Sequence, residues 1–504
     1  MSQSPLRRLL VHTSHYSIAS ALTMVAGLIS FPLLTRIFSV AEYGVMNLIT
    51  ASLSVATAFG KFGIQHSIVR YQSEIANNKS KFTAPQLHAT ALYGMTGSAL
   101  LVTLVMIGIS QFAPERWLGG QQVRFLFAFA SMMVVIGVVE SAITNFLRAN
   151  QETTLLMKYQ VAKKYVGLAL IIGTLFLVAK NLKGFYVPFV ATELFAVIAL
   201  SWIFFKTGTR ERPSPKAFSP ELYKQLIAFG IPMMVGYEVS GIVLAVGDRY
   251  VIDGKIGEEP LGLYSAAYNL CQYVQSVVII SVTQAIIPLY MQIWDQKGKE
   301  ETATFISKSM RTYLLLAAPV IAGLAAVGPE LLPALASDKY EGAGGVLPWI
   351  IAGMVLDGLN PMVGAGLFIQ RRTPVIMGVV LASAILNIVL NLWLVPWIGI
   401  LGAAIATLIS YGVVAVCFTI ASRRILPIVL PWGTLLRSSG AAVVMYGTLH
   451  FVYPGHRFIT VGLRIVIGAP LFALMMFLID ADARAIGQKI LGRLRGMIPR
   501  PGAG

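Results

Sequence analysis

A chain of 504 residues that is 56% hydrophobic and only 12% charged does not have the composition of a soluble protein with several cores. Hydrophobic segments of about 20 residues recur from end to end, and each fits the ~30 Å hydrocarbon core of a bilayer. The net charge of +17 does not indicate nucleic acid, because membrane proteins collect Lys and Arg in their cytoplasmic loops.

The hydrophobic segments predict an all-α integral membrane protein with about fourteen transmembrane helices, because they are too long and too uniformly apolar for barrel strands. Since fourteen is even, both termini lie on one side of the membrane. With the N-terminus inside, roughly three quarters of the 39 Lys and Arg fall on the inner side, so we expect cytoplasmic termini. In chain order the helices lie near residues 13–36, 44–66, 87–112, 123–147, 157–179, 184–205, 224–247, 261–291, 304–327, 345–369, 374–396, 399–421, 436–453 and 459–479.

A basic, proline-containing segment divides the chain after the sixth predicted helix. We expect an N-lobe over residues 1–205 and a C-lobe over residues 224–421, joined by a cytoplasmic linker over residues 206–223. Helices 13 and 14 follow over residues 422–480, and a basic cytoplasmic tail occupies residues 481–504.

The end of the first predicted helix resembles the end of the seventh. Each has an apolar helix, an arginine, a short outer loop, an acidic residue and a glycine that opens the next helix. An offset of six helices keeps the orientation, so the pattern predicts two parallel six-helix repeats, which commonly enclose a site near the bilayer midplane. The matched residues are Arg36, Glu42 and Gly44 in the first half, and Arg249, Glu259 and Gly262 in the second.

Motifs of enzymes and cofactors do not occur in this sequence. There is no P-loop, HExxH, GxSxG or GxGxxG before a helix, and the outer loops are too short for a catalytic domain. The two cysteines, Cys271 and Cys417, fall in apolar segments, and the six histidines show no ligand spacing. We therefore expect a transporter rather than an enzyme, without a metal, a disulfide or an organic cofactor.

Three stretches carry a family resemblance: LLTRxxSxxEYG over residues 33–44, DRYxI…GxYxxAY over residues 248–268 and LNxxLxPxxGixGAAIAT over residues 390–407. Together they resemble the polysaccharide-transport (Wzx-type) flippases of the multidrug/oligosaccharidyl-lipid/polysaccharide exporter superfamily. The resemblance implies a flippase of the bacterial inner membrane that moves an undecaprenyl-diphosphate-linked oligosaccharide from the cytoplasmic to the outer leaflet. It implies ion-coupled alternating access, in antiport with H⁺ or Na⁺, for surface polysaccharides such as the lipopolysaccharide O-antigen.

The same resemblance sets the expected partners. They are the lipid-linked oligosaccharide, the membrane lipids, and polymerase or assembly proteins for the polysaccharide. Nucleic acid is not among them. We expect a monomer, because two internal repeats suffice for alternating access.

A sugar headgroup with a diphosphate needs a polar, cationic cavity, since burying an unpaired charge in hydrocarbon is costly. Arg36 and Arg249 also have a plainer interpretation as interfacial side chains at outer helix ends, and Arg70 as a loop anchor. Lys61 lies within the second predicted helix, where apolar flanks leave it few partners. The six candidates for binding the diphosphate are Arg36, Lys61, Arg70, Lys163, Lys164 and Arg249.

Acidic residues inside predicted helices are candidates for ion coupling. A charge at the bilayer centre costs about 2.5–3.5 kcal/mol on insertion scales, so it indicates a function by default. The plainer interpretation is an ion pair with an embedded Lys or Arg. The four candidates are Glu140, Glu193, Glu238 and Asp357, of which the last two lie most centrally in the second lobe.

Three alternatives stay open at this point. A drug or cation antiporter of the same superfamily would share the fold, although the six candidate cations argue against it. A polymerase or ligase of surface polysaccharide would have similar hydropathy but needs a larger outer loop. A flippase of a lipid-linked peptidoglycan precursor would perform the same chemistry on another headgroup, and the motifs match the polysaccharide branch better.

Overall fold

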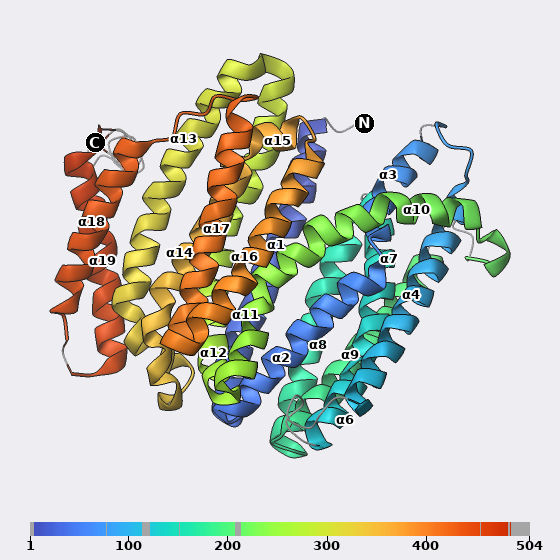
Figure 1. The fold of residues 1–504 in the computed structure, drawn as a ribbon, viewed down its shortest axis with the longest axis horizontal. Helices are drawn as coiled ribbons and strands as arrows, with labels where there is room; N and C mark the ends of the chain where they lie inside the picture. The colour runs from blue at the N-terminus through green and yellow to red at the C-terminus, as the bar shows by residue number, and fades with distance from the viewer. Residues whose placement is uncertain are drawn as a thin grey trace, which may run out of the picture. The chain divides into compact units, whose positions relative to one another are not determined.

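The computed structural model describes residues 5–76, 78–112, 121–150, 152–206, 213–453, 455–481 and 484. Within these ranges every regular element is a helix, which confirms the all-α membrane fold (Figure 1). Twelve helical segments of the described residues are long and apolar enough to cross a membrane. Most of the predicted tail over residues 481–504 lies outside the described ranges.

One compact unit joins residues 1–265 to residues 373–410. Its helices are α1 Pro5–Ile37, α2 Val40–Lys61, α3 Ile64–Ala76, α4 Ala84–Phe112, α6 Gln121–Ala130, α7 Met132–Ala149, α8 Thr153–Leu177, α9 Leu182–Lys206, η1 Pro215–Ala217, α10 Pro220–Met233, η2 Met234–Val239, α11 Ser240–Ile256, the first part of α12 Glu258–Val274, α16 Thr373–Ile398 and the first part of α17 Ile400–Arg423.

The other compact unit joins residues 266–372 to residues 411–504. It holds the rest of α12 and α17 and the following helices: η3 Gln275–Ile280, α13 Ser281–Leu335, η4 Asp338–Val346, α14 Leu347–Val363, α15 Ala365–Ile369, α18 Trp432–His450 and α19 Arg457–Ile479. The predicted lobes over residues 1–205 and 224–421, the linker over residues 206–223 and the six-helix repeats stay predictions.

The count of fourteen spans also stays a prediction. Two predicted spans are helical without being among the twelve segments: residues 436–453 match α18, and residues 261–291 match α12, η3 and the start of α13. In place of the loop predicted between residues 291 and 304, the structure has a sharp break at Gly298, with φ 80° and ψ −163°, inside the segment labelled α13. The break divides α13 into a shorter helix before Gly298 and a longer helix after it.

The seventh predicted span is longer than expected and bent. It runs as α10, η2 and α11 from Pro220 to Ile256 without interruption. Pro232 near the end of α10 and the π-helical turn η2 explain the bend, since both disturb the regular ladder of backbone hydrogen bonds. The first part, α10, packs across α3 and α4 (Figure 1).

The crossing of α10 and α3 depends on two glycines. A Cβ atom on Gly63 would collide with the backbone of Gly230, and a Cβ atom on Gly230 would lie 2.6 Å from the carbonyl carbon of Gly63. Beside this contact the hydroxyl of Ser67 donates to the carbonyl oxygen of Leu226 over 2.9 Å. Small residues therefore let the two backbones approach closely, as in other membrane helix pairs.

Candidate functional site: two membrane-embedded charge clusters

The Lys61 cluster, formed by Lys61, Gln65, His66 and Glu238, joins the end of α2 and the start of α3 to η2. Lys61 Nζ lies 3.0 Å from Glu238 Oε1, and His66 Nε2 lies 3.4 Å from Glu238 Oε2. The amide of Gln65 donates to the same carboxylate. The side chains of Lys61 and Glu238 are 20% and 16% exposed, so neither is fully enclosed by the protein.

Irregular backbone positions both members of this ion pair. The expectation that Lys61 lies inside a helix extending to residue 66 is wrong, because α2 ends at Lys61. Phe62 and Gly63 then adopt left-handed conformations, with φ of 49° and 71°, and α3 begins at Ile64. The ammonium of Lys61 thus lies at the C-terminus of α2, where the helix dipole favours a cation.

Glu238 lies in the π-helical turn η2, Met234–Val239. Such turns are rare and often occur at functional sites, because they re-aim a side chain and leave the backbone less tightly bonded. The carboxylate therefore sits on the part of this long helix that has the least regular hydrogen bonding. A Lys–Glu pair with an adjacent histidine is neutral, or carries one positive charge when the imidazole is protonated.

The Lys163 cluster, formed by Glu140, Tyr159, Lys163 and Glu193, lies between α7, α8 and α9. Lys163 Nζ contacts Glu140 Oε1 at 2.7 Å and Glu193 Oε2 at 2.8 Å. It also lies 5.6 Å from the centroid of the Tyr159 ring, within cation–π range. The three ionic side chains are 16–20% exposed. The cluster thus contains two carboxyl groups and one ammonium.

A small cavity of about 150 Å³ adjoins the Lys163 cluster. Lys163, Lys164 and Glu193 line one part of it, and Phe185 and Phe189 line another. At ~30 Å³ per molecule, it has room for about five waters. It is much smaller than the roughly 300–1,000 Å³ of sites for drug-sized ligands, so it suits water or an ion rather than a sugar.

Of the remaining cationic candidates, Lys164 lines the cavity beside Lys163 and Glu193, and the three arginines belong to neither cluster. Arg36 is exposed in the last turn of α1, and Lys164 is exposed on α8. Arg70 is exposed on α3, where its Nε contacts Glu74 Oε1 at 2.9 Å and its guanidinium lies 5.0 Å from the ring of Phe229. Arg70 therefore matches the plainer interpretation of a local anchor.

Arg249 differs from its predicted setting. It is 6% exposed and lies inside α11, which continues to Ile256, so the prediction that it marks a helix end is wrong. The adjacent Asp248 is fully buried and its Oδ2 accepts a hydrogen bond of 2.5 Å from the hydroxyl of Tyr264. Arg36 and Arg249, which the predicted repeat matches, thus have opposite exposure.

Asp357 is the fourth acidic candidate and lies on α14 in the other unit. Its carboxylate accepts side-chain hydrogen bonds from Asn360 and Gln275. Among the residues that the structure describes, no lysine or arginine forms an ion pair with it. Of the four acidic candidates, three are therefore held by two lysines, and Asp357 is held by amides.

Comparison with known families decides the class of this chain. The family described as "Polysaccharide biosynthesis protein" matches residues 9–294, which is more than half of the sequence. The chain belongs to this family. A second family, described as "MatE", matches residues 248–393. The membership confirms the resemblance to polysaccharide-transport flippases that the three sequence motifs indicated.

Curated relatives of this member of the polysaccharide biosynthesis protein family are distant. An uncharacterized membrane protein of Methanocaldococcus jannaschii is 21% identical over 73% of this chain and 75% of its own length. The succinoglycan biosynthesis transport protein ExoT of Rhizobium meliloti is 22% identical over 70% of this chain, which spans 66% of that protein. A probable low-salt glycan biosynthesis flippase of Haloferax volcanii is 23% identical, and the chain spans 45% of its length.

Solved structures share the fold. The lipid II flippase MurJ in an inward closed conformation aligns with a TM-score of 0.74, covering 93% of this chain and 99% of that one at 14% identity. An inward-facing multidrug resistance MATE family transporter of the MOP superfamily aligns with a TM-score of 0.62, covering 82% and 97% at 13% identity. This family member therefore has the helical fold of MOP superfamily transporters.

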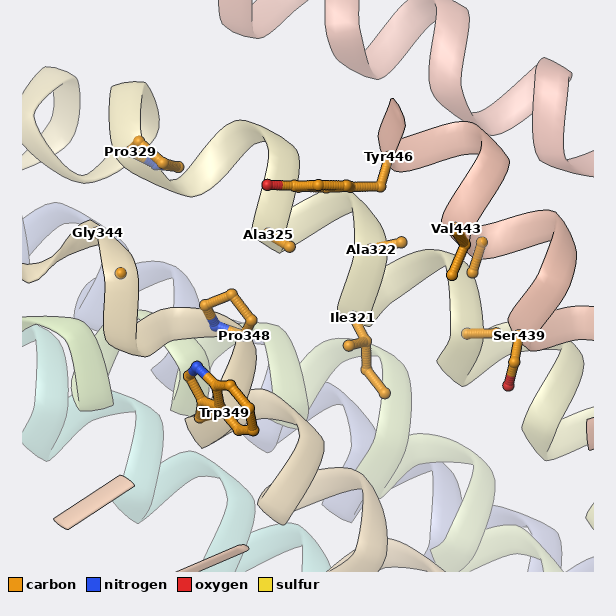
Figure 2. Close-up of a pocket in the computed structure, with 13 residues that line it drawn as sticks. Ile321, Ala322, Ala325, Pro329, Gly344, Pro348, Trp349, Ser439, Val443 and Tyr446 are labelled. Carbon is orange, nitrogen blue, oxygen red and sulfur yellow. The ribbon is translucent and has the colours of Figure 1, made fainter. Parts of the chain in front are cut away.

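The same family member holds a larger cavity in its other unit, of about 600 Å³, between α13, α14 and α18. Ile321 on α13, Trp349 on α14 and Val443 on α18 line it, with alanines between them (Figure 2). The hydroxyls of Ser439 and Tyr446 are among its few polar groups. The lining suits hydrocarbon, and none of the ten residues predicted to bind substrate or ions lies in it.

A buried arginine fastens the last helix beside that cavity. Arg464 on α19 is 6% exposed, and its Nη1 lies 2.8 Å from Glu330 Oε2 on α13. Its Nε donates to the carbonyl oxygen of Val452 over 3.0 Å. Since removing one partner of a buried ion pair is strongly destabilising, this pair fixes α19 to α13.

Sequence reasoning missed several residues of both the site and its frame. His66, Gln65 and Tyr159 carry no spacing signal, because their partners are far away in the chain or are shared with a third group. Arg464 was recognisable as a charge within the last predicted span, and its partner Glu330 as a carboxylate at the end of another. What the sequence could not supply was which cation meets which carboxylate.

Proposed function

We propose that this protein is a flippase that moves a lipid-linked oligosaccharide across the membrane by alternating access coupled to an ion gradient. The observation that carries the proposal is the pairing of Lys61 with Glu238 at irregular backbone within two membrane-spanning segments. Membership of the polysaccharide biosynthesis protein family supports the substrate class. A lipid-linked saccharide joined through a diphosphate, such as an undecaprenyl-diphosphate oligosaccharide, fits a site that can offer an ammonium to a phosphate.

In this proposal the Lys61 cluster exchanges partners. While Glu238 is ionised, it occupies Lys61 and the two charges cancel. When Glu238 takes up a proton, its attraction for Lys61 falls, and the ammonium and His66 become available to the diphosphate. Release of that proton restores the ion pair and expels the anion. Proton movement and substrate movement are thereby linked without a cofactor.

The setting of the flippase is part of the same proposal. The distribution of Lys and Arg supports cytoplasmic termini, and the family supports a role in polysaccharide biosynthesis. We propose that the protein lies in a bacterial inner membrane and serves a surface polysaccharide such as an O-antigen. We propose a monomer as the transporting unit. Polymerase and assembly proteins that use the translocated oligosaccharide are its natural partners.

Proteoliposomes test the proposal directly. The purified chain is reconstituted with a labelled undecaprenyl-diphosphate oligosaccharide, a pH gradient is imposed, and the fraction that reaches the opposite leaflet is measured with an enzyme that cannot cross the bilayer. The wild-type protein should translocate the lipid, and Lys61→Ala should reduce the rate at least tenfold. Lys299→Ala, which removes an exposed lysine of α13, is the matched control and should leave the rate unchanged. Equal rates in protein-free vesicles would refute the flippase.

A cation or drug antiporter of the same superfamily is the second candidate. The observation in its favour is the excess carboxylate of the Lys163 cluster beside a cavity of about 150 Å³. Uptake of a fluorescent organic cation by the same vesicles, abolished by Glu193→Gln and untouched by Lys61→Ala, would establish this function instead.

A flippase for the lipid-linked peptidoglycan precursor is the third candidate, because the fold is shared with the lipid II flippase MurJ. The vesicle assay distinguishes this third function from the proposed one by the headgroup of the lipid that is translocated. Lipid II offered alongside the oligosaccharide substrate should be translocated poorly if the proposed substrate class is right. Preferential translocation of lipid II would establish the third function in place of the proposed one.

A further inference from the structure

A pocket lies where α17 ends and α18 begins, and it takes no part in the charge clusters above. We name it the interfacial pocket, and its volume is about 460 Å³. The last turn of α17 contributes Thr419, Ser422 and Arg423, and the connecting segment contributes Val429 and Leu430. Because this segment joins one apolar helix to the next, the pocket lies at the level of the membrane surface.

Hydrogen bonds and a buried side chain fix the position of the connecting segment. The backbone amides of Ile425 and Leu426 both donate to the carbonyl oxygen of Ser422 over 2.9 Å, and the side chain of Leu426 is fully buried. The hydroxyl of Ser422 accepts a hydrogen bond of 3.0 Å from the amide of Gly366. The wall of the pocket is therefore joined to α15 by a hydrogen bond.

The lining of the interfacial pocket is amphipathic. Arg423 is exposed and is the cation among the described residues that line it, and no carboxylate lines it. At the other extreme, Val429 is 74% exposed and Trp432 is 62% exposed. Exposed apolar and aromatic side chains beside an arginine are typical of the depth where lipid headgroups meet acyl chains.

The surroundings of the pocket are also basic. Arg424 follows Arg423 and is exposed, and Arg371 and Arg372 are exposed at the end of α15, whose Gly366 bonds to Ser422. Asp480, which follows α19, is fully buried, and its Oδ2 lies 2.9 Å from Nε of Arg437. Among the described residues, the charged groups named here around the pocket are therefore mainly arginines.

We propose that the interfacial pocket binds an anionic membrane phospholipid, with the headgroup phosphate on Arg423 and an acyl chain along Val429 and Trp432. A single lining cation matches the one negative charge of a phosphodiester such as that of phosphatidylglycerol. A diphosphate carries more charge and would call for further cations in the lining. The bound lipid would hold the segment between α17 and α18 at the membrane surface. This site is independent of the proposed substrate site.

Native mass spectrometry of the full-length protein in detergent tests the proposal. Phosphatidylglycerol and phosphatidylcholine with identical acyl chains are titrated separately. The wild-type protein should bind one phosphatidylglycerol at least tenfold more tightly than phosphatidylcholine. Arg423→Gln should weaken that binding about fivefold, the effect of one cation near an anionic headgroup. Arg424→Gln, which removes an adjacent arginine that does not line the pocket, should leave it unchanged.

A second variant keeps the test decisive if Arg423→Gln does not fold. Val429→Glu adds a carboxylate at an exposed position of the wall and should weaken phosphatidylglycerol binding by a similar factor while sparing phosphatidylcholine. Equal losses for Arg423→Gln and Arg424→Gln would indicate only a diffuse basic surface and would overturn the pocket. Displacement of the bound lipid by undecaprenyl diphosphate, one for one, would assign the pocket to the substrate and overturn it as well.

Discussion

The Lys61 cluster lies where two membrane helices lose their regular geometry, whereas the Lys163 cluster lies in the middle of three continuous helices. One joins a helix end with left-handed residues to a π-helical turn, and it pairs one ammonium with one carboxylate and a histidine. The other pairs one ammonium with two carboxylates over distances of 2.7 and 2.8 Å.

This difference indicates different roles for two clusters of similar composition. Regular helices hold Lys163 between two partners, so breaking either contact leaves charge unpaired in a poorly solvated place. Glu238, in contrast, lies in a π-helical turn, and His66 Nε2 lies 3.4 Å from its carboxylate. The Lys163 cluster is therefore suited to fixing α7, α8 and α9 together, and the Lys61 cluster to exchanging partners during transport.

The largest expected effect on stability comes from removing the lysine of the Lys163 cluster. Lys163→Ala leaves two carboxylates facing each other, and it should lower the free energy of unfolding by about 3 kcal/mol. Thermal unfolding of the purified protein in detergent measures the change. Lys164→Ala, which removes the exposed neighbour, should have less than about 0.5 kcal/mol effect. Equal midpoints for the two variants would remove the structural role assigned to Lys163.

A second prediction concerns the backbone rather than the charges. Gly63→Ala should cost about 2–3 kcal/mol, because the site has a positive φ of 71° and a Cβ atom would collide with Gly230. The matched change at the other cluster is Gly167→Ala, whose Cβ would lie 3.3 Å from Cγ2 of Thr192, a side chain able to shift. The midpoint temperatures of thermal unfolding measure both effects. A larger decrease for Gly167→Ala than for Gly63→Ala would contradict the difference drawn between the two clusters.

The smallest effect is expected from removing one of two carboxylates. Glu140→Gln turns the Lys163 cluster into a one-to-one ion pair and should change the rate of substrate translocation less than about twofold, since Gln keeps a hydrogen-bonding group there. Glu238→Gln should reduce proton-driven translocation at least tenfold. The vesicle assay compares the two under one pH gradient, and a reversed order would exchange the roles of the clusters.

Much of the fold could be predicted from the sequence, because hydropathy reports directly on membrane-length helices. The tight turn at Gly399, which has φ of 62° between α16 and α17, was likewise visible as a proline and a glycine between two apolar runs. The continuation of α11 through Arg249 could not be predicted. The charged pair Asp248 and Arg249 is typical of a helix end, and the hydrogen bond from Tyr264 to Asp248 is known only from the structure.

The lysines and carboxylates of the two clusters were predicted from the sequence, but their pairing was not, and His66, Gln65 and Tyr159 were missed. Lys61 and Glu238 are 177 residues apart in the sequence. The helix break after Lys61 depends on the left-handed conformations of Phe62 and Gly63, and a Phe–Gly dipeptide also occurs within continuous apolar helices. Cations and carboxylates were therefore assigned to separate tasks, one to substrate and one to ions. The structure pairs three of the four acidic candidates with two of the cationic ones.

The most direct test of the central claim is the affinity of the purified protein for undecaprenyl diphosphate as a function of pH, measured in a His66→Gln background so that the imidazole does not contribute. With Glu238 present, affinity should rise as the pH falls, because protonation releases Lys61. With Glu238→Gln added, affinity should be high and independent of pH over the same range, and with Lys61→Ala added it should be low throughout. An unchanged pH dependence in the Glu238→Gln protein would contradict the proposed exchange of Glu238 for the diphosphate.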